Sequence, residues 1–200
     1  MRCPLTEPLM RWDLINAYIK KYGFKSFLEI GHDQGIAFDR VEIDLKESVD
    51  PDETTHPTYS MSSDDFFEKY STKYDIIFID GLHEHAQVDR DIKNALAHLN
   101  MGGVIVMHDC HPISEECQRH TFVYPGGEWT GDCWKAYVKN RALLPYDMYV
   151  WDHDWGCGVI DTNMQRSSEL PQLPTIMADM EYAEFVAHPD WMNFVVELPM

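Results

Sequence analysis

The chain has 200 residues, of which 44% are hydrophobic and 25% are charged, so it suits one globular domain and not a disordered tail. Its 34 acidic residues outnumber 16 basic ones, giving a formal net charge of −18, and neither nucleic acid nor an anionic membrane surface is an expected partner. No apolar run approaches the roughly 20 residues that span a bilayer, and we expect no signal peptide because the first ten residues lack an apolar core.

The cysteines are odd in number and lack a Cys-x-x-Cys pair: Cys3, Cys110, Cys117, Cys133 and Cys157. This usage favours a reduced, cytoplasmic compartment and argues against a structural zinc site built on cysteine.

The first part of the chain predicts one helix followed by short strands. Apolar residues at helical spacing predict a helix over 9–22, which Gly23 ends. Strand patterns follow at 27–31, 48–51 and 59–61, and a helix start at 62–65.

The clearest strand is 74–80, which is continuously apolar, as expected of a parallel strand covered on both faces. The pattern then predicts a helix over 84–99, a turn at 100–103, a strand at 104–107, a helix at 134–144 and a hairpin of 146–151 with 158–161.

Alternating strands and helices predict an α/β fold: a Rossmann-like open, mostly parallel, twisted sheet with helices on both faces and a C-terminal antiparallel hairpin. We expect the main domain to span 1–162. The range 163–200 is polar and contains prolines, and it predicts an extension with a capping helix within 177–186.

Ligands of such sheets bind at the carboxyl ends of the strands, so the residues there carry the information. The segment Glu29–Gly35 supplies Gly31 and Gly35 but lacks the G-x-G-x-x-G fingerprint, and taken alone it is equally consistent with an ordinary turn. Asp50 follows Gly31 by 19 positions (50 − 31), where a carboxylate that accepts from ribose hydroxyls is expected, although an Asp before Pro51 is also common in turns.

Two further strand ends carry acids beside histidines. Asp80 and His83 follow the strongest strand, and His108 and Asp109 follow the next one. Adjacent carboxylates repel unless a cation or proton lies between them, and oxygen ligands suit Mg²⁺ or Mn²⁺. The alternative is that Asp80 merely caps the following helix.

The segment 129–135 combines large and polar groups. Trp129 and Trp134 could line a pocket. We slightly favour the alternative that both are core residues and that Asp132 caps a helix.

At these positions the chain resembles the small class I S-adenosylmethionine-dependent methyltransferases, over about 9–162. The resemblance rests on Glu29-x-Gly31, Val49-Asp50-Pro51, Ser62-Ser63-Asp64-Asp65-Phe66-Phe67, 74–83, Gly102-Gly103, 108–112 and Trp129-x-Gly131-Asp132-x-Trp134-Lys135. It implies an S-adenosylmethionine cofactor with Gly31 beside the methionine, Asp50 on the ribose, and Ser63 and Asp64 near the adenine. The full set of expected cofactor-binding residues is Glu29, Gly31, Gly35, Asp50, Ser63, Asp64 and Asp80.

Asp80-x-x-His83 followed by His108-Asp109 is also similar to the metal-dependent sugar O-methyltransferases of macrolide biosynthesis, although those enzymes have an acid in place of His108. This likeness implies a divalent cation such as Mg²⁺ on Asp80, Asp109 and His108, with His83 and Asp80 catalytic. The implied acceptor is a small molecule with a hydroxyl group, a sugar being preferred, and a homo-oligomer is one expected state.

Three alternatives stay open at this point. The first is a metal-independent methyltransferase in which Asp80 and His83 orient the acceptor. The second is a catalytically inactive nucleotide-binding or scaffold module. The third, a nicotinamide-dependent oxidoreductase, is disfavoured by the missing second glycine of the fingerprint.

Overall fold

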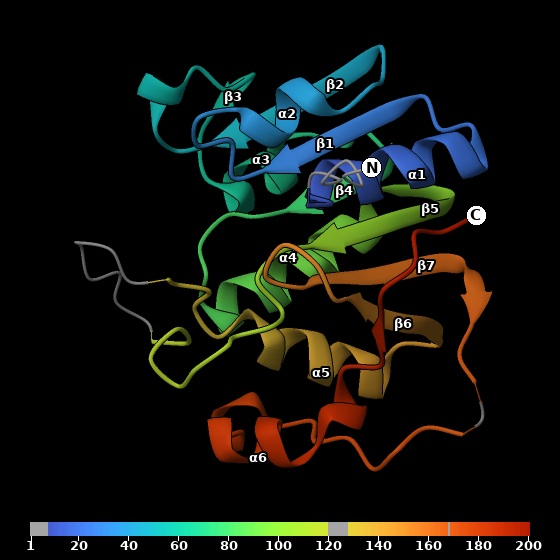
Figure 1. Ribbon diagram of the computed structural model, residues 1–200. Coiled ribbons are helices and arrows are strands. Elements are labelled where there is room, and N and C mark those ends of the chain that lie inside the picture. Colours follow the sequence, from blue (N-terminus) through green and yellow to red (C-terminus); the bar gives the residue numbers. More distant parts are fainter. Residues whose placement is uncertain (1–7, 120–127, 168) are drawn as a thin grey trace, which may run out of the picture.

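The computed structural model describes residues 8–119, 128–167 and 169–200, and its centre is an eight-stranded sheet of order β3-β2-β1-β4-β5-β7-β6-β8 (Figure 1). The strands are β1 (Ser26–Ile30), β2 (Leu45–Asp50), β3 (Tyr59–Ser60), β4 (Tyr74–Ile79), β5 (Leu99–Met107), β6 (Tyr146–Trp151), β7 (Cys157–Gln165) and β8 (Phe194–Val195). The first five strands pair in parallel, whereas β7 runs antiparallel to β5 and β6. The predicted mostly parallel sheet with a C-terminal antiparallel hairpin is confirmed.

Helices cover both faces of this sheet, because its central strands are apolar on both sides. The helices are α1 (Arg11–Tyr22), α2 (Ile36–Arg40), α3 (Ser63–Lys69), α4 (His85–Ala97), α5 (Cys133–Leu143) and α6 (Tyr182–Ala187). Along β4, Ile76 and Phe78 belong to the core cluster with α1, whereas Ile77 and Ile79 belong to the cluster with α3, α4 and α5. This alternation is what a strand with two covered faces requires.

Local chemistry explains where several helices begin and end. Gly23 ends α1 in the left-handed region, with φ of 67°, which favours glycine. The Ser62 hydroxyl caps α3 by accepting the backbone N–H of Asp65 at 3.1 Å. Glu84 and not Asp80 is the N-cap residue of α4, which leaves the Asp80 carboxylate available for other partners.

The predicted turn at 100–103 is wrong, because these residues lie inside β5. Two glycines adapt this strand to its neighbour. Gly102 has φ of 79°, and a Cβ on Gly103 would lie 2.6 Å from the backbone oxygen of Asp75 in β4. The pair therefore permits close strand packing, and a register shift between Tyr74 and Ile76 accompanies it.

The segment after residue 162 packs onto the same sheet and core. β7 continues to Gln165, a short 3₁₀ helix (Met177–Asp179) precedes α6, and β8 pairs in parallel with β6. Phe185 of α6 lies against Trp134 of α5, with ring centroids 5.0 Å apart. The expected helix within 177–186 is thus shorter than predicted and covers α5.

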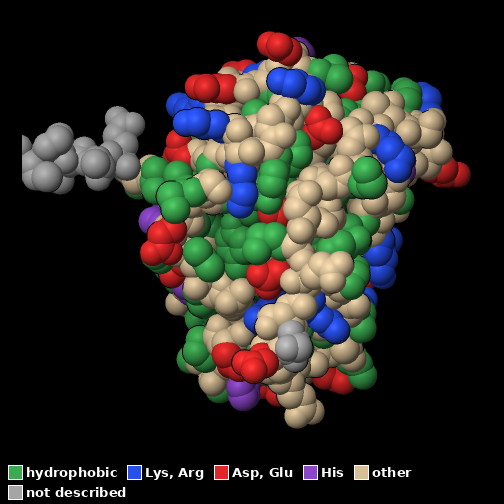
Figure 2. All heavy atoms as spheres, turned by 90° about the vertical axis from the view of Figure 1, so that its right-hand side faces the viewer, with side chains coloured by type: hydrophobic (Ala, Val, Ile, Leu, Met, Phe, Trp, Pro, Cys, Tyr) green, Lys and Arg blue, Asp and Glu red, His purple; other side chains and the backbone are tan. Residues whose placement is uncertain are grey.

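The surface carries side chains of both charge signs, and the described cysteines form no disulfide. Figure 2 shows one face on which basic side chains are scattered among acidic and hydrophobic ones. No helix within the described ranges is long and apolar enough to cross a membrane. Four cysteines are free thiols, Cys110, Cys117, Cys133 and Cys157, and Cys3 lies outside the described residues.

Candidate active site

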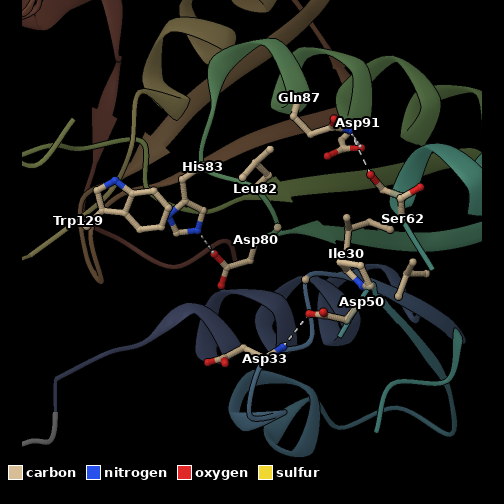
Figure 3. Close-up of a pocket in the computed structure, with 15 residues that line it drawn as sticks. Ile30, Asp33, Asp50, Ser62, Asp80, Leu82, His83, Gln87, Asp91 and Trp129 are labelled. Carbon is tan, nitrogen blue, oxygen red and sulfur yellow. Dashed lines mark hydrogen bonds and ion pairs between the residues drawn. The ribbon is translucent and has the colours of Figure 1, made fainter. Parts of the chain in front are cut away.

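A cavity of about 700 Å³ opens at the carboxyl ends of β1, β2 and β4 (Figure 3). Its wall comes from the loops after β1 and β4, the end of β2, the start of α3, one side of α4 and Trp129. Five of the expected site residues line it: Gly31, Asp50, Ser63, Asp80 and His83. The topology thus brings together residues that lie far apart in the sequence, as the parallel arrangement predicts.

The loop after β1 is shaped by Gly31 and held by Asp50. Gly31 has φ of 89°, and a Cβ there would lie 2.1 Å from the backbone oxygen of Asp80, so no side chain fits. The Asp50 Oδ2 accepts the backbone N–H groups of His32 at 2.8 Å and Asp33 at 3.1 Å. Its Oδ1 accepts the N–H of Asp52 at 2.9 Å. Asp50 therefore ties the end of β2 to the glycine loop at the cavity wall.

Three expected cofactor-binding residues do not reach the cavity wall. Glu29 is 2% exposed and its Oε2 lies 2.9 Å from His32 Nδ1. Burial and the nearby Asp80 carboxylate raise the pKa of Glu29 to about 9. Gly35 begins α2 with φ of 69°. Asp64 is exposed and pairs with Arg90 at 3.3 Å.

An ionic cluster forms at one end of the cavity, where β4 and β5 finish side by side. His83 Nδ1 lies 3.1 Å from Asp109 Oδ2, and His83 Nε2 lies 3.4 Å from Asp80 Oδ1. One ligand atom from each of these three residues falls within 4.8 Å of the others. His108 Nδ1 approaches the same carboxylates, at 3.3 Å from Asp80 and 3.1 Å from Asp109.

Burial and charge act against each other in this cluster. Desolvation alone would lower the pKa of His83, but the carboxylates of Asp80 and Asp109 outweigh it and raise that pKa. Desolvation likewise opposes the charged form of His108, yet Asp109 and Asp80 raise its pKa well above the usual value. The Nδ1 of His83 is buried and makes no hydrogen bond among the described residues, although Asp109 is close.

No pattern in the sequence indicated the cation that joins this cluster. Arg11, the first residue of α1, donates from Nη1 to Asp80 Oδ2 at 2.6 Å. Its Nε donates to Asp154 Oδ2 at 2.8 Å, and its Nη2 to Asp154 Oδ1 at 3.3 Å. The backbone oxygen of Asp154 lies 2.7 Å from His108 Nε2. Arg11 and Asp154 therefore connect α1 and the β6–β7 turn to the end of β4.

Trp129 and Trp134 have different roles, so the prediction that both are core residues is wrong for Trp129. Trp134 is fully buried, whereas Trp129 lines the cavity and stacks on His83, with ring centroids 4.6 Å apart and planes at 23°. Gly131 allows this approach, because a Cβ there would lie 1.8 Å from the backbone oxygen of His83. Asp132 stands at the N-cap position of α5, as predicted, but its carboxylate accepts the backbone N–H of His85 at 2.8 Å and no backbone N–H of α5.

The other end of the cavity is polar and buried. Gln87 Nε2 donates to Asp91 Oδ1 at 3.1 Å and to the Ser63 hydroxyl at 3.2 Å. Asp91 is 1% exposed, and burial raises its pKa to about 6. Sequence reasoning missed this pair, since acids and amides on a helix are usually solvated. Their i, i+4 spacing on α4 is the one local signal that they share a face.

Comparison with known proteins supports the fold and the class. Residues 28–110 match the family model described as Methyltransferase domain. A search of curated proteins finds no significant match to this chain. A solved structure described provisionally as a caffeoyl-CoA O-methyltransferase, from Staphylococcus aureus, has a TM-score of 0.56 at 17% identity, covering 75% of this chain and 82% of that one.

Two further solved structures show how widely this fold is used. An O-methyltransferase from Bacillus cereus in complex with S-adenosylhomocysteine has a TM-score of 0.55 at 14% identity, covering 76% of this chain and 80% of that one. The N-methyltransferase NodS from Bradyrhizobium japonicum has a TM-score of 0.50 at 14% identity, covering 74% and 90%. At such identities the likeness establishes the fold and leaves the acceptor undefined.

The fold and the cavity at the carboxyl ends of the parallel strands are those of a class I methyltransferase. Residues 28–110 match a methyltransferase domain, and this match together with the fold supports an S-adenosylmethionine-dependent methyltransferase.

Proposed function

We propose that this enzyme binds S-adenosylmethionine in the cavity and methylates a hydroxyl group of a small molecule, such as a sugar, with the help of a divalent cation. The observation that carries the proposal is the convergence of Asp80 and His83, which line the cavity, with the buried Asp109; one ligand atom from each of the three lies within 4.8 Å of the others. The proposed catalytic domain is 1–162, with 163–200 as an extension that covers α5.

The cofactor would extend from the ionic cluster toward α3 and α4. Gly31 lets the loop after β1 pack directly on the backbone of Asp80, and the methionine part would lie beside this loop. Asp50 would hold the ribose. Its carboxylate accepts three backbone N–H groups, and with about four acceptor positions it can still take a hydroxyl. Ser63 lines the cavity at the adenine end.

The residues at the ionic cluster fit a divalent cation. Two carboxylates and an imidazole are a suitable donor set for Mn²⁺ and, with water completing the shell, for Mg²⁺. Asp80 and Asp109 would hold the ion, with His108 as the nitrogen ligand. His83 Nδ1, which is buried and makes no hydrogen bond among the described residues, would stay unbound and able to take a proton. Such a cation supplies charge that lowers the pKa of an acceptor hydroxyl.

The protein's own part is positioning and proton removal, because the sulfonium of the cofactor is already an activated methyl donor. His83 lies between the two carboxylates and stacks on Trp129, which fixes the plane of its ring. From this position His83 would accept the proton of an acceptor hydroxyl in its unprotonated form. Asp80 would orient both His83 and the acceptor.

A metal-independent methyltransferase is the second candidate, and Arg11 is the observation that favours it. Its guanidinium already supplies a positive charge to Asp80 at 2.6 Å. In this version Asp80 and His83 orient the acceptor, and no divalent cation is needed.

Methyl transfer to a panel of hydroxyl acceptors, before and after EDTA treatment, separates the two candidates. Under the metal-assisted proposal, EDTA and Asp109→Asn each reduce turnover at least about 100-fold, and Mg²⁺ or Mn²⁺ restores the EDTA-treated enzyme. Binding of S-adenosylhomocysteine stays unchanged in Asp109→Asn. Glu68→Gln, at an exposed carboxylate on α3, is the control and keeps full turnover. Turnover that survives both treatments would select the metal-independent mechanism.

A further inference from the structure

A buried carboxylate at the end of the cavity remote from the ionic cluster has no part in the chemistry described above. Asp91 lines the cavity from α4 and is 1% exposed. Figure 3 shows Asp91, Gln87 and Ser62 at one end of the cavity, and His83 with Trp129 at the other. Burying a carboxylate is costly unless donors satisfy it, so its presence in a ligand cavity calls for a ligand donor.

The protein supplies Asp91 with few donors. Gln87 Nε2 donates to Asp91 Oδ1 at 3.1 Å, and the Ser63 hydroxyl on α3 is a second hydrogen-bond partner of this carboxylate. The nearest charges are Asp64, which repels it, and Arg90, which attracts it but donates to Gln87 and Asp64 instead. A carboxylate can accept about four hydrogen bonds, so acceptor positions on Asp91 remain.

Gln87 holds this carboxylate in a fixed orientation. Its amide oxygen accepts from Arg90, and its amide nitrogen donates to Ser63 and Asp91. The same nitrogen also lies 3.3 Å from Asp64 Oδ1, so α3 and α4 are joined through one amide. Because the amide oxygen of Gln87 accepts from Arg90, only its amide nitrogen can face Asp91. The acceptor positions that remain at this end of the cavity are therefore on the Asp91 carboxylate.

We infer that Asp91 is a specificity-determining residue that accepts a hydrogen bond from the exocyclic amino group of the cofactor's adenine. The inference rests on the proposed placement of the cofactor in this cavity. The amino group is the hydrogen-bond donor on that edge of adenine, and a carboxylate without free protons accepts but does not donate. A 6-oxo purine has an oxygen in place of this amino group. Its oxygen and the Asp91 carboxylate would then be two hydrogen-bond acceptors facing each other.

The test compares two ligands that differ at this position, S-adenosylhomocysteine and S-inosylhomocysteine, by isothermal titration calorimetry. Hydrogen bonds to charged groups are worth about 1.5–3 kcal/mol, so the wild-type enzyme should prefer the adenosyl ligand by roughly 10- to 100-fold. In Asp91→Asn the amide can present either oxygen or nitrogen, and the preference should fall below about 3-fold. Glu68→Gln is the control, because Glu68 is an exposed carboxylate on α3 outside the cavity wall, and it should keep the wild-type preference.

The possible outcomes distinguish a failure of the Asp91 role from a failure of the proposed cofactor site. Tight adenosyl binding with equal inosyl binding in the wild-type enzyme overturns the role of Asp91 and leaves the cofactor site intact. An unchanged preference in Asp91→Asn, or a lost preference in Glu68→Gln, also overturns it. Absence of any S-adenosylhomocysteine binding to the wild-type enzyme overturns the cofactor site itself. The comparison of two ligands on the wild-type enzyme needs no variant, so it holds even where Asp91→Asn fails to fold.

Discussion

Replacing Arg11 with methionine removes the cation that joins α1 to the ends of β4 and the β6–β7 turn. The variant keeps a side chain of similar length but loses the contact with Asp80 at 2.6 Å and the two contacts with Asp154 at 2.8 and 3.3 Å. Asp154 is then left 3% exposed without its guanidinium partner, while its backbone oxygen still faces His108.

The structure sets the size of the expected effect. Removing one partner of a buried ion pair costs about 3–5 kcal/mol, because the other charge stays buried. The Arg11 side chain is 22% exposed, so we expect the lower end of this range, about 3 kcal/mol. For a chain of this size that corresponds to a fall in Tm of roughly 6–12 °C.

Thermal unfolding monitored by circular dichroism checks this prediction against Arg90→Met. Arg90 also pairs with an aspartate, Asp64 at 3.3 Å, but both side chains are about half exposed, at 52% and 48%. Such exposed pairs contribute about 0–1 kcal/mol, so the control should melt within ~4 °C of the wild type. Equal melting temperatures for the two variants would refute the structural role assigned to Arg11.

Two further predictions concern the loop after β1. Glu29 keeps its proton up to pH about 9 in the folded protein but loses it near the usual pKa of 4.5 when unfolded, so stability should fall as pH rises between these values. Glu29→Gln should flatten that slope in urea unfolding curves measured from pH 5 to 9, and an unchanged slope counts against a buried, protonated Glu29. Gly31→Ala should cost more than ~3 kcal/mol, because its Cβ would lie 2.1 Å from the backbone of Asp80. In the matched control Gly81→Ala, the Cβ would lie 3.5 Å from the Ile30 side chain and 3.8 and 3.9 Å from backbone atoms of Ile30 and Gly31. These are ordinary van der Waals distances, so the control should be nearly neutral in the same unfolding assay.

The parts of the site that the sequence predicted are those where one strand brings a residue to the edge of the sheet. The continuous apolar run before Asp80 requires a doubly covered parallel strand, and such a strand places its last residue at the ligand edge. Gly31, Asp50 and Asp80 therefore share one cavity, as predicted.

The parts that were missed depend on contacts between distant segments. Arg11 and Asp154 are 143 residues apart, and nothing local indicates that they meet. Trp129 looked like a core residue because an aromatic side chain beside a polar loop can lie either in the core or on a cavity wall. The close contact between the backbones of Gly131 and His83 places it on the wall. The Gly102–Gly103 pair predicted a turn, since glycine is common in turns, but here it permits close strand packing.

The central claim is that one cavity holds the cofactor beside a metal-binding cluster, and a crystal structure of the enzyme grown with S-adenosylhomocysteine and Mn²⁺ tests it most directly. The account predicts the ligand along the cavity between Asp80 and Asp91, and an anomalous manganese peak among Asp80, His83 and Asp109. Ligand density elsewhere on the protein, or a manganese peak remote from these three side chains, would contradict it.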